Sequence, residues 1–263
     1  MIKFTPGFWA ANLTPLALLY ILLCMTSVTV FGQTGSPLAP PFPGPRIGVQ
    51  AGITENEQQG QFETDCGCAY PKGSGTGITI AALGERFIGK KWSLVGMFSI
   101  SMKNTTSTND SLSPIQKNFV KQNNAVDSGP VALTEQAKTQ LTYISIVPMM
   151  RYYIASGLFL EAGPSIGFAL SSNLLAQETV NTSGYTFLDG STTRTIQNKA
   201  IPNISSFDVS LYGSLGYAFQ LSKLLYFTPG VAVDFPLTSV QSGTNWKIMS
   251  FQITGAITWA LHL

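Results

Sequence analysis

The final segment of the chain alternates between apolar and polar or small side chains, and this pattern constrains the fold more than any other feature. Its apolar positions are Met249, Phe251, Ile253, Gly255, Ile257, Trp259, Leu261 and Leu263. Successive side chains of a strand point to opposite faces, so the pattern predicts one long strand with one oily face. The 12 steps from Met249 to Leu261 span about 40 Å at ~3.3 Å each. At a tilt of ~45° they cover about 28 Å, close to the apolar band of a membrane-spanning strand.

Seven earlier segments show the same alternation with different regularity. They lie at 46–54, 75–87, 91–103, 139–154, 158–171, 207–221 and 225–238. The total of eight is even, as in single-chain bacterial barrels. In hydrocarbon every backbone N–H and C=O needs a partner within the protein, and closed barrels supply one. The sequence therefore predicts an all-β fold: an eight-stranded antiparallel up-and-down transmembrane β-barrel.

The predicted connections alternate in length. Short turns lie at 88–90, 155–157 and 222–224, and longer polar loops at 55–74, 104–138, 172–203 and 239–245. Short periplasmic turns and long extracellular loops are typical of barrels in the outer membrane of Gram-negative bacteria. Aromatic residues near strand ends suggest girdles at the two membrane surfaces: Trp92, Tyr152, Tyr226 and Trp259 toward the turns, Phe207 and Trp246 toward the loops.

The first residues resemble a secretion signal. Lys3 supplies a positive start, an apolar stretch covers 16–31, and the small residues Val30 and Gly32 predict cleavage before Gln33. The alternatives are an uncleaved membrane helix at 13–31 and a lipid anchor on Cys24. We expect a signal peptide at 1–32, a Pro/Gly-rich periplasmic linker at 33–45 and the barrel at 46–263.

The charge balance excludes some classes of partner. Charged residues make up 11% of the chain and the net charge is +2, whereas soluble domains average roughly 25% charged residues. The sequence has no basic cluster of the kind that binds nucleic acid. The expected surroundings are the lipid of the outer membrane, and the sequence identifies no specific protein or ligand partner.

One hairpin carries a family resemblance. Residues 141–171 read LTYISIVPMMRYYIASGLFLEAGPSIGFALS, with the matching positions Tyr143, Ile146, Pro148, Tyr152, Tyr153, Leu160, Glu161, Ala162, Gly163, Pro164 and Gly167. This stretch resembles the small outer-membrane β-barrel family of Bacteroidota known as PorT-like or porin-like, and weaker similarity extends from about Ile47 to the C-terminus. The chain departs from the common barrel pattern by ending in Leu263 rather than Phe. The resemblance implies an outer-membrane barrel inserted by the barrel-assembly machinery, and it carries over no enzymatic activity.

Four charged residues are expected to face the barrel interior. Counting back from the turn at 155–157 places Arg151 opposite Glu161, and we predict an inward ion pair that fills the lumen. A gate or proton relay is the functional alternative for this pair. Asp208 and Asp234 also have inward parity, and we expect them to join the polar interior.

Two further motifs resemble functional sites but lack the residues that such sites need. Cys66 and Cys68 form a Cys-Gly-Cys that can close a loop disulfide, and no neighbouring ligands suggest zinc. Gly163-Pro164-Ser165-Ile166-Gly167 matches a hydrolase nucleophile motif, but it lies within a predicted strand, and His262, the one histidine of the sequence, lies on a distant one. We therefore predict no catalytic residue, cofactor or metal.

These observations favour a non-enzymatic outer-membrane protein with a structural, adhesive or envelope-assembly role that displays its outer loops. A narrow channel or transporter for small solutes is the main alternative. Two further alternatives are a lipid-modifying enzyme and a soluble ligand-binding barrel of lipocalin type. A lipocalin-type barrel would turn its apolar face inward.

Overall fold

The fold of the barrel was obtained as a computed structural model, which describes residues 44–64, 69–109, 119–121, 126–127 and 131–261. The predicted signal peptide, all but the last two residues of the predicted linker, Cys66, Cys68 and His262 lie outside these residues. Within the described residues, no helix has the length and apolar character needed to cross a membrane.

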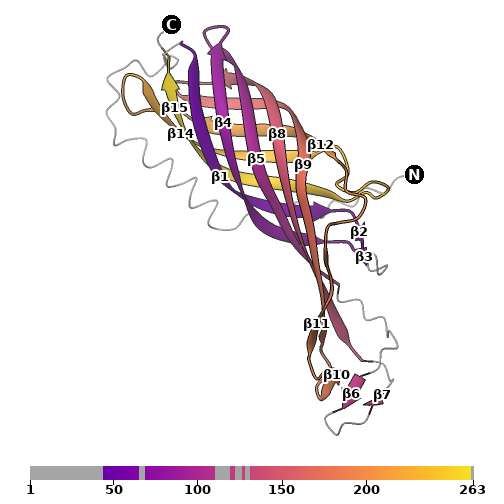
Figure 1. The fold of residues 1–263 in the computed structure, drawn as a ribbon. Helices are drawn as coiled ribbons and strands as arrows, with labels where there is room; N and C mark the ends of the chain where they lie inside the picture. The colour runs from indigo at the N-terminus through magenta and orange to yellow at the C-terminus, as the bar shows by residue number, and fades with distance from the viewer. Residues whose placement is uncertain (1–43, 65–68, 110–118, 122–125, 128–130, 262–263) are drawn as a thin grey trace, which may run out of the picture. The chain divides into compact units, whose positions relative to one another are not determined.

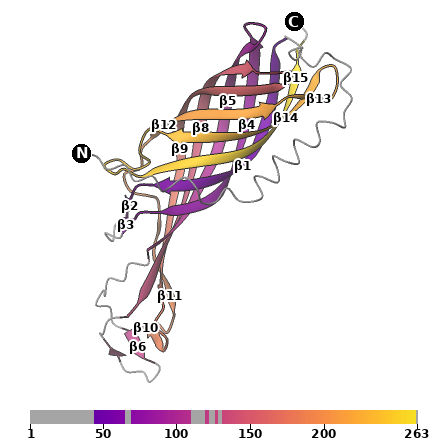
Figure 2. The same cartoon turned by 180° about the vertical axis from the view of Figure 1, so that it is seen from behind.

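Eight antiparallel strands close a ring (Figures 1 and 2). In ring order they are β1 (Arg46–Gln59), β4 (Gly73–Phe87), β5 (Trp92–Asn109), β8 (Leu133–Tyr153), β9 (Leu158–Val180), β12 (Phe207–Tyr217), β14 (Leu225–Pro236) and β15 (Lys247–Ala260). β15 pairs with β1 from Lys247↔Gln59 to Ala260↔Arg46, which closes the barrel. The predicted eight-stranded barrel is confirmed.

Apolar side chains cover the outside of the ring, whereas its interior contains polar side chains together with buried apolar ones such as Val95, Met97, Val147 and Met149. Exposed positions include Ile47, Val49, Ile53, Ile80, Phe98, Ile146, Leu160, Ile166, Leu211, Leu215, Phe251, Ile253 and Ile257. Buried positions between them include Thr54, Thr79, Ser99, Ser145, Ser165, Ser210, Ser214, Thr228, Gln252 and Thr258. This arrangement is the reverse of a lipocalin-type barrel and suits a lipid environment.

Tight turns join the strands at one end of the barrel. Ile154 donates its backbone N–H to the Leu158 carbonyl at 2.9 Å, and Leu221 donates to Leu225 at 2.9 Å. Gly157 has a φ of 80°, a conformation that side chains disfavour. We call this end, where β1 begins and β15 finishes, the turn end, and the opposite end the loop end.

Several strands extend further at the loop end than the sequence predicts. The β8–β9 ladder continues to Leu133↔Val180, and β11 (Thr193–Lys199) pairs with β9 there. The loops predicted at 104–138 and 172–203 are therefore partly strand. In β8 and β9 these extensions turn apolar side chains such as Leu133, Ala137, Leu174 and Val180 inward and mostly polar ones outward. They therefore lack the outward apolar face that marks a membrane-spanning strand in the sequence.

Short strands complete the loop end. β2 (Phe62–Glu63) pairs with β3 (Ala69–Tyr70) between β1 and β4. β10 (Tyr185–Phe187) pairs with β6 (Phe119–Lys121), which pairs with β7 (Val126–Asp127). At the turn end, β13 (Phe219–Gln220) extends the ladder along β14.

Candidate functional site: the filled lumen

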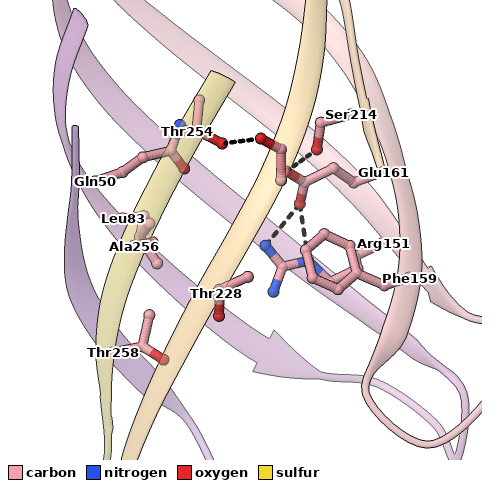
Figure 3. A pocket seen from close by; sticks show the side chains of 11 residues that line it. Gln50, Leu83, Arg151, Phe159, Glu161, Ser214, Thr228, Thr254, Ala256 and Thr258 are labelled. Carbon is pink, nitrogen blue, oxygen red and sulfur yellow. Dashed lines mark hydrogen bonds and ion pairs between the residues drawn. The ribbon is translucent and has the colours of Figure 1, made fainter. Parts of the chain in front are cut away.

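Arg151 and Glu161 lie directly opposite each other on β8 and β9 and point into the lumen (Figure 3). The Arg151 Nε donates to Glu161 Oε2 at 2.8 Å, and Nη2 lies 2.7 Å from the same oxygen. The Ser214 hydroxyl donates to the other oxygen, Oε1, at 2.7 Å. Both carboxylate oxygens of Glu161 therefore have partners, which a buried charge requires.

A second carboxylate, that of Glu85, connects this pair to the neighbouring strands. Its Oε2 lies 3.1 Å from Arg151 Nη1 and 3.6 Å from Arg46 Nη1. Its Oε1 accepts hydrogen bonds from the hydroxyls of Ser93 at 2.6 Å and Tyr153 at 2.7 Å. The two arginines and two glutamates balance in charge, and we call these residues with Ser93, Tyr153 and Ser214 the turn-end network.

Aromatic rings pack against both guanidinium groups of the network. The Arg46 guanidinium lies 4.1 Å from the centre of the Tyr226 ring, and that of Arg151 lies 3.9 Å from the centre of the Phe159 ring. A pocket beside Arg151, Glu161 and Phe159 has a volume of about 10 Å³, room for about one water molecule. The turn end of the lumen is therefore filled with side chains.

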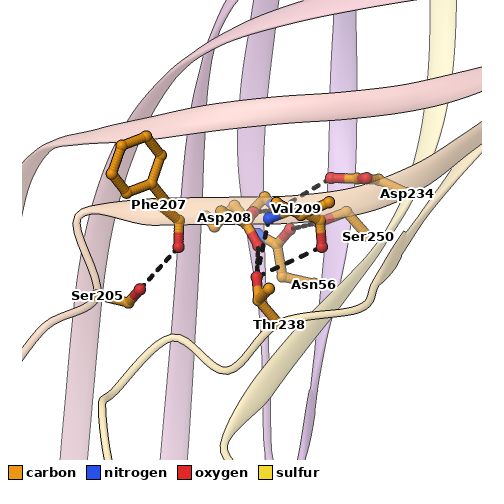
Figure 4. Close-up of polar contacts among 9 residues, drawn as sticks. Asn56, Ser205, Phe207, Asp208, Val209, Asp234, Thr238 and Ser250 are labelled. Atoms are coloured by element: carbon orange, nitrogen blue, oxygen red, sulfur yellow. Dashed lines mark hydrogen bonds and ion pairs between the residues drawn. The ribbon is translucent and has the colours of Figure 1, made fainter.

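A separate charged group, which we call the lysine–aspartate triad, lies nearer the loop end. Lys103 on β5 reaches across the ring to β12 and β14, where its Nζ lies 3.0 Å from Asp208 Oδ2 and 2.9 Å from Asp234 Oδ2. Figure 4 shows Asp208 beside Thr238, whose hydroxyl lies 3.5 Å from Asp208 Oδ1. All three charged side chains are buried, so the triad spans the interior.

Apolar side chains close the lumen at the loop end. This cluster, here called the loop-end lid, comprises Phe62, Tyr70, Ala137, Leu141, Tyr143, Leu174, Ile201, Val240, Trp246 and Ile248. Its members come from β8, β9 and the β11–β12 connection on one side of the ring and from β15, the β14–β15 connection and the β1–β4 connection on the other, so the cluster crosses the interior. The Phe62 ring centre lies 5.0 Å from that of Tyr70 and 4.8 Å from that of Trp246.

The inward residues expected from the sequence thus fall into two separate groups. Arg151 and Glu161 belong to the turn-end network, whereas Asp208 and Asp234 share Lys103. Sequence reasoning missed Arg46, Glu85 and Lys103. Strand parity pointed to Arg46 and Lys103, because each adjoins an outward apolar residue, Ile47 or Met102.

Two aromatic predictions are wrong. Tyr226 is 1% exposed and Trp246 is 0% exposed, so both lie inside the barrel rather than in a membrane girdle. Tyr226 packs on Arg46, and Trp246 belongs to the lid. Trp92, Trp259 and Phe207 are exposed as expected.

The hydrolase-like motif lies inside a continuous strand. Ser165 pairs with Ser210 in the middle of the β9–β12 ladder, where no strand-to-helix turn presents its hydroxyl. In the part of the chain that the structure describes, no group of three or more His, Cys, Asp or Glu side chains is placed to hold a metal ion.

Comparison with solved structures gives matches of low identity and low TM-score. The chain is similar to Ail, the attachment invasion locus protein of Yersinia pestis, at 9% identity, with 82% of this chain and 99% of that chain covered and a TM-score of 0.33. It is also similar to Neisserial surface protein A at 11% identity, with 82% of this chain and 97% of that chain covered and a TM-score of 0.36. The translocator domain of the autotransporter NalP from Neisseria meningitidis is 10% identical to it, with 94% of this chain and 97% of that chain covered and a TM-score of 0.31.

No curated protein matches the chain in sequence. The family model described as outer membrane protein beta-barrel domain matches residues 43–242, about three quarters of the chain. The match starts just before β1 and covers seven of the eight ring strands. The chain therefore belongs to the outer membrane protein β-barrel domain family, and it is an integral β-barrel of the outer membrane.

Proposed function

We propose that this protein is a non-enzymatic anchor with a structural, adhesive or envelope-assembly role, whose closed barrel displays the loop end outside the cell. The observation that carries the proposal is the filled lumen, which is crossed by the turn-end network, the lysine–aspartate triad and the loop-end lid and also holds a buried apolar cluster that includes Met97, Met149 and Tyr212. Such a filled interior favours anchoring over conduction, because an eight-stranded barrel is only wide enough for side chains.

The strand extensions supply the displayed surface. Leu170 on β9 is the last exposed apolar residue of that strand toward the loop end, and β9 continues ten residues further to Val180, about 33 Å along the strand. The outward residues of β8 in this region are Thr134, Gln136, Lys138 and Gln140. A polar sheet that rises beyond the apolar band supports a role in recognition at the cell surface.

We further infer that the protein is of the PorT-like type, is secreted with cleavage before Gln33 and is inserted by the barrel-assembly machinery. The residues that carry the resemblance, 141–171, form most of the β8–β9 hairpin. The N-terminal sequence of protein purified from outer membranes tests the cleavage: a chain that starts at Gln33 supports it, and one that retains Lys3 contradicts it.

Single-channel recording in planar bilayers tests the closed lumen. We expect the purified, folded protein to give no conductance steps. Phe62→Ala/Trp246→Ala opens the lid but leaves the turn-end network in place, so it should also give none. Stable steps from the wild-type protein would contradict the anchor and favour the channel.

Trypsin treatment of intact cells tests the display. Arg194 and Lys199 at the loop end are exposed, as are Lys90, Lys91 and Lys223 in the turns. Intact cells should be cleaved at the first pair, and the second group should be cleaved after permeabilisation alone. Cleavage at the turns of intact cells would reverse the proposed orientation.

A further inference from the structure

The two charged groups of the lumen differ in their balance. The turn-end network contains two arginines and two glutamates, so its charges cancel. The lysine–aspartate triad contains one ammonium and two carboxylates, which leaves one negative charge in a buried position. A buried net charge is unfavourable unless something compensates it.

Oxygen atoms without partners gather on the wall beside the triad. Within the described residues, Asp234 Oδ1, Ser210 Oγ, Gln252 Oε1, Thr54 Oγ1 and Thr79 Oγ1 are buried and accept or donate no hydrogen bond. All five residues are more than nine-tenths buried. Native interiors leave few such atoms, and several together indicate a site for water or an ion.

The strand register makes these five positions one continuous patch. Thr54 lies directly opposite Gln252. On one side Asp234 lies opposite Ser250 of β15, which is two residues before Gln252. On its other side Asp234 lies opposite Tyr212 of β12, which is two residues after Ser210. Residues two apart share a face, so β12, β14, β15 and β1 present these oxygens side by side. Thr79, two residues from the Gly77 that faces Thr54, extends the patch to β4.

We propose that the triad and this patch bind one small monovalent cation of about the size of Na⁺ in the outer half of the lumen. Asp234 Oδ1 supplies the charged oxygen and Gln252 Oε1 a neutral one, and water completes the shell and connects the ion to the hydroxyls of Ser210 and Thr54. One positive charge cancels the surplus of the triad.

The donor set selects the class of ion. Oxygen donors suit hard cations, whereas zinc and copper sites use His and Cys. Calcium sites use six to eight oxygens and usually several carboxylates, but Asp208 and Asp234 already share the Lys103 ammonium through their Oδ2 atoms. A single free carboxylate oxygen therefore favours a monovalent ion.

The layers on either side of the site enclose the ion. Tyr143 belongs to the loop-end lid, and its ring centre lies 5.4 Å from the Lys103 ammonium. On the other side, toward the turn-end network, lies a buried apolar cluster that includes Val147, Tyr212 and Ala232. An enclosed ion is captured as the barrel folds, so its binding appears in the folding equilibrium.

Equilibrium urea unfolding in detergent micelles tests the proposal, with NaCl compared with N-methylglucamine chloride at equal ionic strength. An ion that binds only the folded state divides the equilibrium constant of unfolding by the factor 1 + [Na⁺]/Kd. This factor is about ten when the Na⁺ concentration is about ten times Kd. We expect a saturable stabilisation by Na⁺ that N-methylglucamine does not give. Superimposable curves in the two salts would overturn the proposal and leave water or a proton in the site.

Asp234→Asn removes the charged ligand and keeps the shape of the side chain, so the Na⁺ dependence should disappear. Glu55→Gln removes an exposed carboxylate from the outward face of β1 and should leave the dependence intact. If Asp234→Asn does not fold, Gln252→Met removes a neutral ligand and should weaken the dependence. An Asp234→Asn barrel that responds to Na⁺ like the wild type would show that the ion binds elsewhere.

Discussion

Replacing Glu161 with Gln tests the turn-end network most directly. The substitution keeps the size of the side chain and removes the charge that Arg151 contacts through two nitrogens at 2.8 and 2.7 Å. The Arg151 guanidinium keeps Glu85 at 3.1 Å, and the new amide oxygen can still accept one hydrogen bond. The network changes from neutral to one net positive charge in a buried place.

The expected loss of stability follows from these contacts. Removing one partner of a fully buried ion pair costs about 3–5 kcal/mol. Because Glu85 remains beside Arg151, we expect a smaller loss of about 2–3 kcal/mol, the upper range of one hydrogen bond to a charged group. The side chains of Arg151 and Glu161 are 7% and 6% exposed, so solvent screening does not reduce this value much.

Urea unfolding of the barrel in detergent micelles measures the loss. With an m-value of about 2 kcal/mol/M, the midpoint should fall by about 1–1.5 M at constant slope. Glu55→Gln, the same chemical change at an exposed position of β1, should shift the free energy of unfolding by less than about 0.5 kcal/mol. Equal midpoints for Glu161→Gln and the wild type would refute the view that this pair stabilises the barrel.

Three other substitutions test the remaining layers of the molecule. Lys103→Met leaves two buried carboxylates together, so we expect the free energy of unfolding to fall by about 3–5 kcal/mol in the same assay. The double variant Lys103→Met/Asp208→Asn should recover part of this loss, and no recovery would argue against charge repulsion as its cause. Trp246→Ala opens a cavity in the lid and should cost about 3–5 kcal/mol, clearly more than Trp259→Ala at an exposed position, and equal losses would contradict the lid. Ile166→Arg places a charge on the outward face midway along β9 and should lower the free energy of unfolding in lipid vesicles by about 2–4 kcal/mol. Leu221→Arg at the turn end should lower it by about 0–1 kcal/mol, and the reverse order would contradict the assigned apolar band.

The partition of residues between the two faces of the barrel was predictable from the sequence. Strand parity is a local property, because each side chain alternates with its immediate neighbours. Ile253 and Ile257 could therefore be placed outside, and Gln252 and Thr258 inside, without knowledge of the other strands. The opposition of Arg151 and Glu161 was equally local, since a three-residue turn sets the register of one hairpin.

Contacts across the lumen could not be predicted in this way. Lys103 meets Asp208 and Asp234 because closure of the ring brings β5 opposite β12 and β14, and the stagger of all eight strands decides which residues share a level. The strand extensions at the loop end were also hidden, because their apolar side chains, such as Leu133 and Leu174, face inward and their outward face is mostly polar.

The sequence by itself therefore determined the number of ring strands, the faces they turn to lipid and to the interior, and the pairing within one hairpin. Only the tertiary structure decided which inward residues meet, that Trp246 and Tyr226 lie inside, and that three layers of side chains cross the lumen. The physical reason is that alternation depends on neighbours along one strand, whereas the filling of the lumen depends on how all the strands close.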